Sequence, residues 1–185
     1  MRVIAGTAKR AVLTAPEGFN TRPTSDRAKE SLFNILGGTV KGGCFLDLFS
    51  GSGAIGIEAL SRGAKEAVFA DSSKIAINSI TANLAKTKLS HAATVLNMTA
   101  ETAVAKLADE GRRFDIVFLD PPYGLGIPQS FTGMLSRCPV LADGAVLVLE
   151  TDSRETEYAV PAFTLIDTRV YGRTCFLFYK AEAEL

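Results

Sequence analysis

The segment CFLDLFSGSGAIGIEALSR, residues 44–62, contains the pattern that decides the fold. Its first part, CFLDLF, is a short and almost continuous apolar run, which is typical of a strand that is buried on both faces. SGSG interrupts this run, and apolar residues then return with helical spacing in AIGIEALSR. The segment therefore predicts a strand, a glycine-rich turn and a helix.

The same alternation continues toward the C-terminus. Strands are expected at residues 66–71, 94–98, 114–120 and 144–150, and helices at 73–86, 100–110 and around 128–137. Strands that alternate with helices form right-handed βαβ units and a parallel sheet. Two further strand-like runs, 163–171 and 174–181, are joined by Gly172-Arg173, and so short a connection joins only antiparallel strands. We expect an α/β, Rossmann-like doubly wound sheet, mostly parallel, with a C-terminal antiparallel hairpin.

The first forty residues do not follow this alternation, and we expect them to form an N-terminal extension (1–40) on a main domain (41–185). RVIAG and AVLTA have the spacing of a small hairpin. RPTSDRAKESLFNIL then has helical periodicity, and Thr24 or Ser25 is in position to cap this helix. The apolar face of the expected helix consists of Ala28, Leu32, Phe33 and Leu36.

Composition and charge narrow the class of protein. Apolar residues make up 47% of the 185-residue chain and the net charge is zero, which fits a globular protein with a substantial core. Residues 1–30 nevertheless hold six basic side chains against three acidic ones, so a polyanion would be attracted to this end. Widely spaced cysteines and a single histidine predict neither a metal site nor a disulfide framework. Without a signal peptide or an apolar run of membrane-spanning length, the expected location is cytoplasmic.

The glycine-rich turn predicts a ligand that contains adenosine. Gly51-Ser-Gly53-Ala-Ile-Gly56 matches G-x-G-x-x-G between a strand and a helix, where bare backbone lets a ligand approach closely. Asp71 follows Gly51 by twenty residues, and an acid at that position accepts hydrogen bonds from ribose hydroxyls. NAD and S-adenosylmethionine both contain adenosine, so this motif does not separate them.

Asp47 favours S-adenosylmethionine over a dinucleotide. It lies inside the expected strand, four residues before Gly51, and a buried carboxylate is costly unless a positive charge neutralises it. The methionine ammonium group of S-adenosylmethionine is cationic, whereas the pyrophosphate of a dinucleotide is anionic. We therefore expect Asp47 to meet the ammonium group, directly or through water.

A second motif, Asp120-Pro121-Pro122-Tyr123, stands at the end of the strand expected at 114–120. Ligands of open α/β sheets bind beyond the carboxyl ends of the strands, so this motif should lie beside the glycine loop. Two successive prolines fix the backbone and remove two donors, which leaves the Asp120 carboxylate and the Pro121 carbonyl as acceptors on a rigid corner. Two acceptors can aim an exocyclic amine of a base at a methyl group, and Tyr123 offers a face on which the base can stack.

LDLFSGSGAIGIEALSRGA and DPPY together resemble the class I amino-methyltransferases, which use S-adenosyl-L-methionine. RPTSDRAKESLFN near the N-terminus and RVYGRT at 169–174 are similar to the bacterial 16S ribosomal RNA (guanine-N2) methyltransferase family. The resemblance implies the class I methyltransferase fold and methyl transfer to the N2 amino group of a guanine in 16S ribosomal RNA. It further implies an RNA target within a partly or fully assembled small ribosomal subunit, and we expect the enzyme to be a monomer without a metal.

The resemblance also implies roles for individual residues. Those expected to bind the cofactor are Asp47, Ser50, Gly51, Gly53, Asp71, Ser72, Thr99 and Ala100. Those expected to hold the target guanine are Asp120, Pro121, Pro122 and Tyr123, and Arg22 and Arg27 are expected to contact RNA. The sequence departs from many relatives at Thr99, where they carry an acid or an amide; Asn97 is nearby.

Other functions remain open at this point. G-x-G-x-x-G also occurs in NAD-dependent oxidoreductases, although the chain has no Tyr-x-x-x-Lys and its single histidine, His91, lies in a polar connector. A non-catalytic RNA-binding assembly factor could use the same fold, but the acceptors of the second motif are intact. The same chemistry could also serve adenine N6 in nucleic acid or a protein glutamine, and the N-terminal block argues against both.

Overall fold

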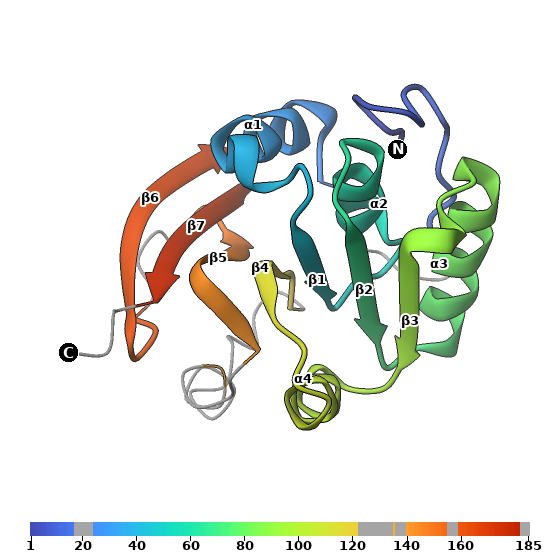
Figure 1. Cartoon of the computed structure of the whole chain (residues 1–185). Coiled ribbons are helices and arrows are strands. Elements are labelled where there is room, and N and C mark those ends of the chain that lie inside the picture. The colour runs from blue at the N-terminus through green and yellow to red at the C-terminus, as the bar shows by residue number, and fades with distance from the viewer. Residues whose placement is uncertain (17–23, 122–134, 136–139, 155–158, 182–185) are drawn as a thin grey trace.

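The computed structural model describes residues 1–16, 24–121, 135, 140–154 and 159–181 of the chain. In this part the chain forms a seven-stranded sheet with helices on both faces (Figure 1). The strands are β1 (Cys44–Leu48), β2 (Glu66–Asp71), β3 (Ala93–Asn97), β4 (Phe114–Leu119), β5 (Leu141–Asp152), β6 (Phe163–Tyr171) and β7 (Thr174–Ala181). The helices are α1 (Asp26–Leu36), α2 (Ala54–Ser61), α3 (Lys74–Thr87) and α4 (Ala100–Asp109), with short 3-10 helices at Gly37–Thr39 and Ser90–Ala92.

The strand order is β3-β2-β1-β4-β5-β7-β6. Strands β1 to β5 run parallel, whereas β7 pairs antiparallel with both β5 and β6. Gly172 and Arg173 join β6 to β7 as the two-residue connection predicted. The doubly wound sheet with its antiparallel hairpin is thereby confirmed. The helix expected around 128–137 lies outside the described residues except for Leu135, which is helical and buried.

Each face of the sheet has its own hydrophobic core, because successive strand side chains point to opposite faces. The N-terminal residues, α1, α2 and α3 cover one face, and α4 covers the other (Figure 1). Phe45, Phe69, Phe118 and Phe176 are at most 1% exposed and belong to the first core. Side chains one position further along the strands, such as Leu46, belong to the second core.

The N-terminal extension forms the short hairpin and the helix that the sequence predicts. Arg2 and Val12 form an antiparallel bridge, and the Val3 N–H donates to the carbonyl of Ala11 at 2.9 Å. Ser25 caps α1, since its hydroxyl accepts a hydrogen bond from the Ala28 N–H at 3.2 Å. Side chains of the hairpin and of α1 lie in the same core as α2 and α3, so the extension packs as part of that layer.

The side chain of Asn83 in α3 binds the backbone of the N-terminal extension, with one hydrogen bond accepted and one donated, as a neighbouring β-strand would. Its side chain is buried; Oδ1 accepts from the Thr14 N–H, and Nδ2 donates to the Thr14 carbonyl, both at 2.9 Å. The same Nδ2 group donates to the Ser52 carbonyl at 2.9 Å. Ser52 belongs to the glycine loop, so Asn83 connects the extension directly to that loop.

Glu58 in α2 is a second attachment point. Its carboxylate is fully buried and accepts hydrogen bonds from the N–H groups of Ile4 and Ala5, at 2.7 and 3.0 Å. Lys29 Nζ lies 3.2 Å from Oε2, and Arg62 Nε lies 2.8 Å from Oε1. These partners satisfy the buried carboxylate of Glu58, and they attach both the hairpin, through Ile4 and Ala5, and α1, through Lys29, to α2.

The position of Lys29 corrects the sequence-based view of the N-terminal charge. Lys29 is only 2% exposed, because it pairs with Glu58 and donates to the carbonyl of Arg2. Its charge is therefore used inside the protein and is not available to a polyanion at the surface. Among the N-terminal basic residues that the structure describes, Arg2, Lys9, Arg10 and Arg27 are exposed, and Arg2 forms an ion pair with Asp26.

Replacing Lys29 with alanine should destabilise the protein strongly. Glu58 would remain buried with one charged partner fewer, and breaking a buried ion pair from one side costs about 3 kcal/mol. Urea unfolding followed by circular dichroism measures the change in the free energy of unfolding. Arg27→Ala, an exposed substitution on the same helix, should change it by no more than about 0.5 kcal/mol. Equal effects of the two variants would show that the Lys29–Glu58 pair does not anchor the extension.

Candidate active site

The glycine loop follows β1, and its backbone has positive φ angles, which residues other than glycine rarely adopt. Phe49, although it is not glycine, has φ +60°, and Gly51 and Gly53 have φ +55° and +74°. The Gly53 N–H donates to the Ser50 carbonyl at 2.7 Å and closes a tight turn. If Gly51 carried a Cβ atom, the nearest heavy atom to it would be the Phe49 carbonyl oxygen, at 4.0 Å. Open space therefore borders the loop where the sequence predicts a ligand.

Ser50, expected to bind the cofactor, uses its hydroxyl to join β1 to β2. Its Oγ donates to the carbonyl of Asp47 at 2.6 Å and accepts from the Ala70 N–H at 3.0 Å. The side chain is 9% exposed. Ser50 thus shapes the loop through the backbone of two strands, and a direct contact with a cofactor stays a prediction.

Asp47 lies in β1 directly beneath α2. It is 2% exposed, and its Oδ2 accepts a hydrogen bond from the Gly56 N–H at 2.9 Å. A Cβ at position 56 would meet Phe69 Cε1 at 2.3 Å, so only glycine allows α2 to approach the sheet this closely. No basic side chain of the described residues forms an ion pair with Asp47.

Asp71 stands at the end of β2 and faces the glycine loop. Its Oδ2 accepts from the Gly51 N–H at 2.9 Å, and its Oδ1 accepts from the Ser73 N–H at 2.8 Å. These two bonds orient the carboxylate next to the open side of Gly51. The side chain is half-buried, which leaves part of it accessible to a ligand.

Residues at the end of β3 complete this side of the site. Asn97 Nδ2 donates to the carbonyls of Asp71 and Ser72, each at 3.1 Å, and holds the end of β2 in place. Thr99 caps α4, because its Oγ1 accepts from the Thr102 N–H at 3.3 Å. Ala100 is buried against the core under α4, and the Ser72 side chain is exposed. Cofactor contacts of Ser72, Thr99 and Ala100 stay predictions.

Asp120 and Pro121 follow β4 and meet β1 at its carboxyl end. The Asp120 N–H donates to the Leu48 carbonyl at 3.4 Å, which joins the corner to the strand that carries Asp47. Both Asp120 and Pro121 are half-buried. Pro122 and Tyr123, expected to hold the target base, lie outside the described residues.

Glu150 in β5 is a fourth acid of this site, and the sequence does not single it out. In the parallel register Leu119 pairs with Leu149, so Asp120, which directly follows β4, lies next to Glu150 of β5. Glu150 is 2% exposed, and both of its carboxylate oxygens accept from the Thr24 hydroxyl, at 3.2 and 2.9 Å. It ends the apolar run GAVLVLE as Asp47 interrupts CFLDLF, and this shared signal could have revealed it.

Burial and neighbouring charges raise the pKa values of two of these acids, Asp47 and Asp120. Burial raises the pKa of Asp47 to about 8, with smaller contributions from the charges of Asp71 and Glu150, while the Gly56 N–H acts in the opposite direction. Burial also raises the pKa of Asp120 well above its ordinary range, and the charges of Glu150 and Asp47 add to this effect. The site therefore favours ligands that bring hydrogen-bond donors or positive charge.

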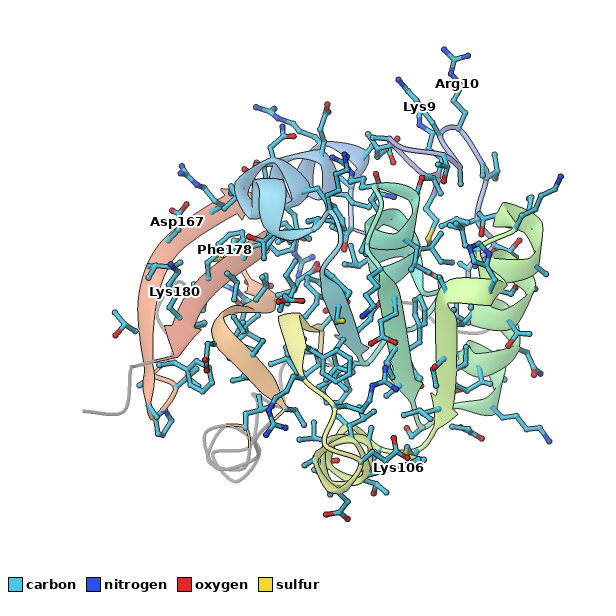
Figure 2. The ribbon with its side chains drawn as sticks, in the orientation of Figure 1. Lys9, Arg10, Lys106, Asp167, Phe178 and Lys180 are labelled. Carbon is cyan, nitrogen blue, oxygen red and sulfur yellow. The ribbon has the colours of Figure 1, made fainter. Side chains whose placement is uncertain are left out.

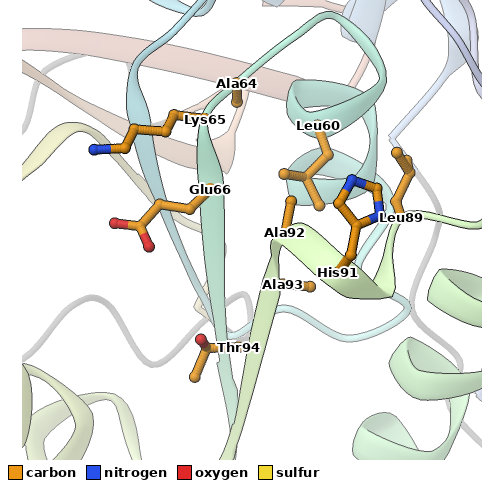
Figure 3. A pocket seen from close by; sticks show the side chains of 9 residues that line it. All are labelled: Leu60, Ala64, Lys65, Glu66, Leu89, His91, Ala92, Ala93 and Thr94. Atoms are coloured by element: carbon orange, nitrogen blue, oxygen red, sulfur yellow. The ribbon is translucent and has the colours of Figure 1, made fainter.

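A separate hollow of about 390 Å³ lies at the opposite edge of the sheet, where β2 and β3 begin (Figure 3). Its lining includes Leu60, Lys65, Glu66, His91 and Thr94. Because it borders the amino ends of the strands, it has no part in the site formed by Asp47, Asp71 and Asp120. His91 is exposed there, at some distance from both motifs.

The described residues were also compared with the requirements of a metal site and of a membrane-spanning helix. They contain no group of three or more His, Cys, Asp or Glu side chains placed to hold a metal ion. None of the helices in this part of the chain combines the length and the apolar character needed to cross a membrane.

Comparison with known proteins places the chain in a family. The family described as "Conserved hypothetical protein 95" matches residues 1–180. The chain belongs to this family. It is 40% identical to "Putative rRNA methyltransferase YlbH" of Bacillus subtilis over 182 residues, which cover 97% of this chain and 98% of the relative. It is also 34% identical to "Ribosomal RNA small subunit methyltransferase D" of Escherichia coli K12 over 185 residues, which cover 100% of this chain and 91% of the relative.

A solved structure confirms the fold of this family member. "Putative methyltransferase yhhF from Escherichia coli" superposes with a TM-score of 0.86 at 34% identity, covering 100% of this chain and 99% of that one. The class I methyltransferase fold expected from the sequence is thus confirmed, as is the resemblance to the small-subunit rRNA methyltransferases.

The raised pKa of Asp47 predicts how the stability of this family member depends on pH. Folded Asp47 keeps its proton up to a pH of about 8, whereas an ordinary aspartate ionises near 3.8. Between these values the folded state holds more protons than the unfolded state, so its stability falls as the pH rises. Asp47→Asn keeps an acceptor for the Gly56 N–H and should remove this contribution to the decline.

Urea unfolding of the ligand-free protein at pH 5 and pH 8 tests this expectation. The Asp47→Asn variant should lose less stability between the two pH values than the unmodified protein does. Asp109→Asn, at an exposed position in α4, serves as the control and should keep the original decline. An unchanged decline in the Asp47 variant would contradict the assignment of the proton to Asp47.

Proposed function

We propose that this protein transfers a methyl group from S-adenosyl-L-methionine to the exocyclic N2 amino group of a guanine in small-subunit (16S) ribosomal RNA. One observation carries the proposal: the glycine loop and Asp71 lie beside the Asp120–Pro121 corner, at the carboxyl ends of neighbouring strands. The hydrogen bond from the Asp120 N–H to the Leu48 carbonyl joins the two halves of this site. A cofactor pocket and a set of acceptors for an amine thus share one edge of the sheet.

The residues of the first half fit S-adenosylmethionine. The open side of Gly51 admits a ligand against the backbone, and Asp71 presents a carboxylate there for ribose hydroxyls. Asp47 is buried and holds its proton to a pH of about 8, so the methionine ammonium group would stabilise its charged form. The anionic pyrophosphate of NAD would not, which disfavours a dehydrogenase.

S-adenosylmethionine, when bound, supplies an electrophilic methyl group on a sulfonium centre. The protein then has to orient the amine, because the lone pair of a base amine is delocalised into the ring. The Asp120 carboxylate and the Pro121 carbonyl accept hydrogen bonds from the two N–H groups and direct the lone pair at the methyl group. Tyr123 would stack on the base, and Pro122 would keep the corner rigid.

The RNA target is supported by the names of the relatives and by exposed basic residues. Lys9 and Arg10 project from the turn of the N-terminal hairpin into solvent (Figure 2), and Arg27 is exposed on α1. We propose that Arg27 and Arg22, which lies outside the described residues, contact phosphates and position the RNA. The extension 1–40 would then act as the RNA-binding part of the main domain at 41–185, in a monomeric cytoplasmic enzyme.

Nucleoside mass spectrometry tests the reaction. RNA that has been incubated with the protein and labelled S-adenosylmethionine should yield labelled N2-methylguanosine from the small-subunit RNA. Naked RNA and partly assembled small subunits are compared in parallel, and large-subunit RNA serves as the control. Labelled N6-methyladenosine, or label in protein alone, would overturn the guanine assignment.

Two substitutions should separate catalysis from cofactor binding. Asp120→Ala removes an acceptor for the amine and should lower turnover at least about 100-fold, the scale of losing one electrostatic contact of the transition state. Its affinity for S-adenosylmethionine, measured by calorimetry, should change little. Asp71→Ala is the matched control, because it removes the ribose acceptor and should weaken cofactor binding about 10- to 100-fold. If both variants lost cofactor affinity equally, the two halves of the site would not have the separate roles proposed.

A further inference from the structure

One hydrogen bond joins two segments that are far apart in the sequence, helix α1 and the turn between β6 and β7. The hydroxyl groups of Ser31 in α1 and Tyr171 at the end of β6 are hydrogen-bonded to each other (Figure 1). The ring of Tyr171 lies beside that of Phe176, with the ring centroids 6.2 Å apart. Ser31 belongs to RPTSDRAKESLFN and Tyr171 to RVYGRT. The proposed function uses the first of these motifs for RNA and gives no role to the second.

Two exposed arginines stand close to this contact, one on each segment. Arg27 lies one helical turn before Ser31, on the same side of α1. Arg173 follows Tyr171 by two residues, in the turn that leads into β7. The side chain of Arg173 is 73% exposed, and Arg27 is exposed as well. The contact between the two segments therefore brings two cationic side chains to one surface.

This surface borders the acceptor corner after β4. The Ser153 N–H, directly after β5, donates to the carbonyl of Arg173 at 2.9 Å. Asp120 lies level with Glu150 of β5, so Arg173 stands about 10 Å further along, three residues beyond that level at about 3.3 Å each. Thr24, which precedes α1, donates to Glu150. The turn and the start of α1 thus both reach the edge of the sheet at which the proposed reaction takes place.

Arg173 carries the positive charge that remains when the ion pairs around the turn are counted. Arg154 Nε lies 2.7 Å from Asp152, and Arg169 lies 3.0 Å from Asp167. The guanidinium group of Arg173 lies 3.8 Å from Asp152, which is too far for a hydrogen bond. Because this group is largely exposed, it can present its planar set of donors to an anion, and arginine often binds phosphate through two parallel hydrogen bonds.

We infer that Arg173 binds a phosphate of the RNA strand that carries the target base, on the same surface as Arg27. This inference rests on the proposed function, and it adds the β6–β7 turn to the RNA-binding surface. A base reaches the acceptor corner only when it is turned out of its strand. Phosphates held at the rim of the corner fix the register of the strand while the corner reads the base. Ser31 and Tyr171 are positioning residues, because their hydrogen bond fixes the turn relative to α1.

The salt dependence of RNA binding tests the phosphate contact. The RNA used is the naked small-subunit RNA or the partly assembled subunit, whichever the unmodified protein methylates. Arg173→Ala should weaken its binding about 5- to 10-fold, and the slope of log affinity against log salt concentration should shrink by about 0.7. Arg173→Lys keeps the charge without the planar donors, so it should restore the salt slope and only part of the affinity. In methylation assays the KM for RNA should rise, while kcat and the affinity for S-adenosylmethionine stay unchanged.

Two further variants separate a local contact from a general effect of charge or structure. Arg113→Ala is the matched control, because Arg113 is exposed directly before β4, at the opposite edge of the sheet. It removes the same charge and should leave the RNA affinity and the salt slope nearly unchanged. Tyr171→Phe removes the hydroxyl that is bonded to Ser31 and keeps the ring. It should weaken RNA binding less than Arg173→Ala does, without a change in the salt slope.

The outcomes distinguish this inference from the proposed function. If Arg173→Ala and Arg113→Ala had equal effects on affinity and salt slope while the unmodified protein produced N2-methylguanosine, the turn would hold no phosphate and the proposed function would stand. A loss of affinity in Arg173→Ala with an unchanged salt slope would assign the turn to a partner other than phosphate and would also overturn the inference. If the unmodified protein methylated no RNA, both proposals would fall.

Discussion

The close approach of α2 to the sheet at Gly56 is the constraint on which the site depends. A side chain at that position would collide with Phe69, since its Cβ would lie 2.3 Å from Cε1. The same approach directs the Gly56 N–H to the carboxylate of Asp47, at 2.9 Å. The glycine loop must then reverse within a few residues, and it does so through positive φ values at Phe49, Gly51 and Gly53. Helix packing, loop shape and the polar centre of the site thus follow from one missing side chain.

Much of the fold could be predicted because its strands are nearly continuous apolar runs with clear breaks between them. The bounds of β2, β6 and β7 agree with the runs at 66–71, 163–171 and 174–181. β5 begins at Leu141 rather than at residue 144, because Leu141 pairs with Phe114 across an irregular register. That pairing depends on a strand far away in the sequence, and no local pattern contains it.

The site was predictable where a motif is local and not where partners come from distant segments. Asp47, Asp71 and Asp120 were found because each stands at a recognisable position after or within a strand. Lys29 is one of the six basic residues of 1–30 that the sequence counts toward attracting a polyanion, but it is buried, because its partner Glu58 is on another helix. Glu150 was missed although it ends an apolar run, since Thr24, the residue that orients it, is 126 positions away. Asn97 shows the same limit, because its side-chain amide donates to the carbonyls of Asp71 and Ser72, about 25 positions away.

The strand order has a consequence for how the chain reaches its native state. β7 lies between β5 and β6 and is their shared partner, although it is made after both. During synthesis, which proceeds from the N-terminus, β6 has no place in the sheet until residues 174–181 have emerged. Until then β5 exposes an unpaired edge of apolar residues next to Glu150, and such edges attract other chains. Of the strands that the structure describes, the last to be translated is thus the one that covers the edge of β5, so protection of this edge against aggregation arrives only with β7.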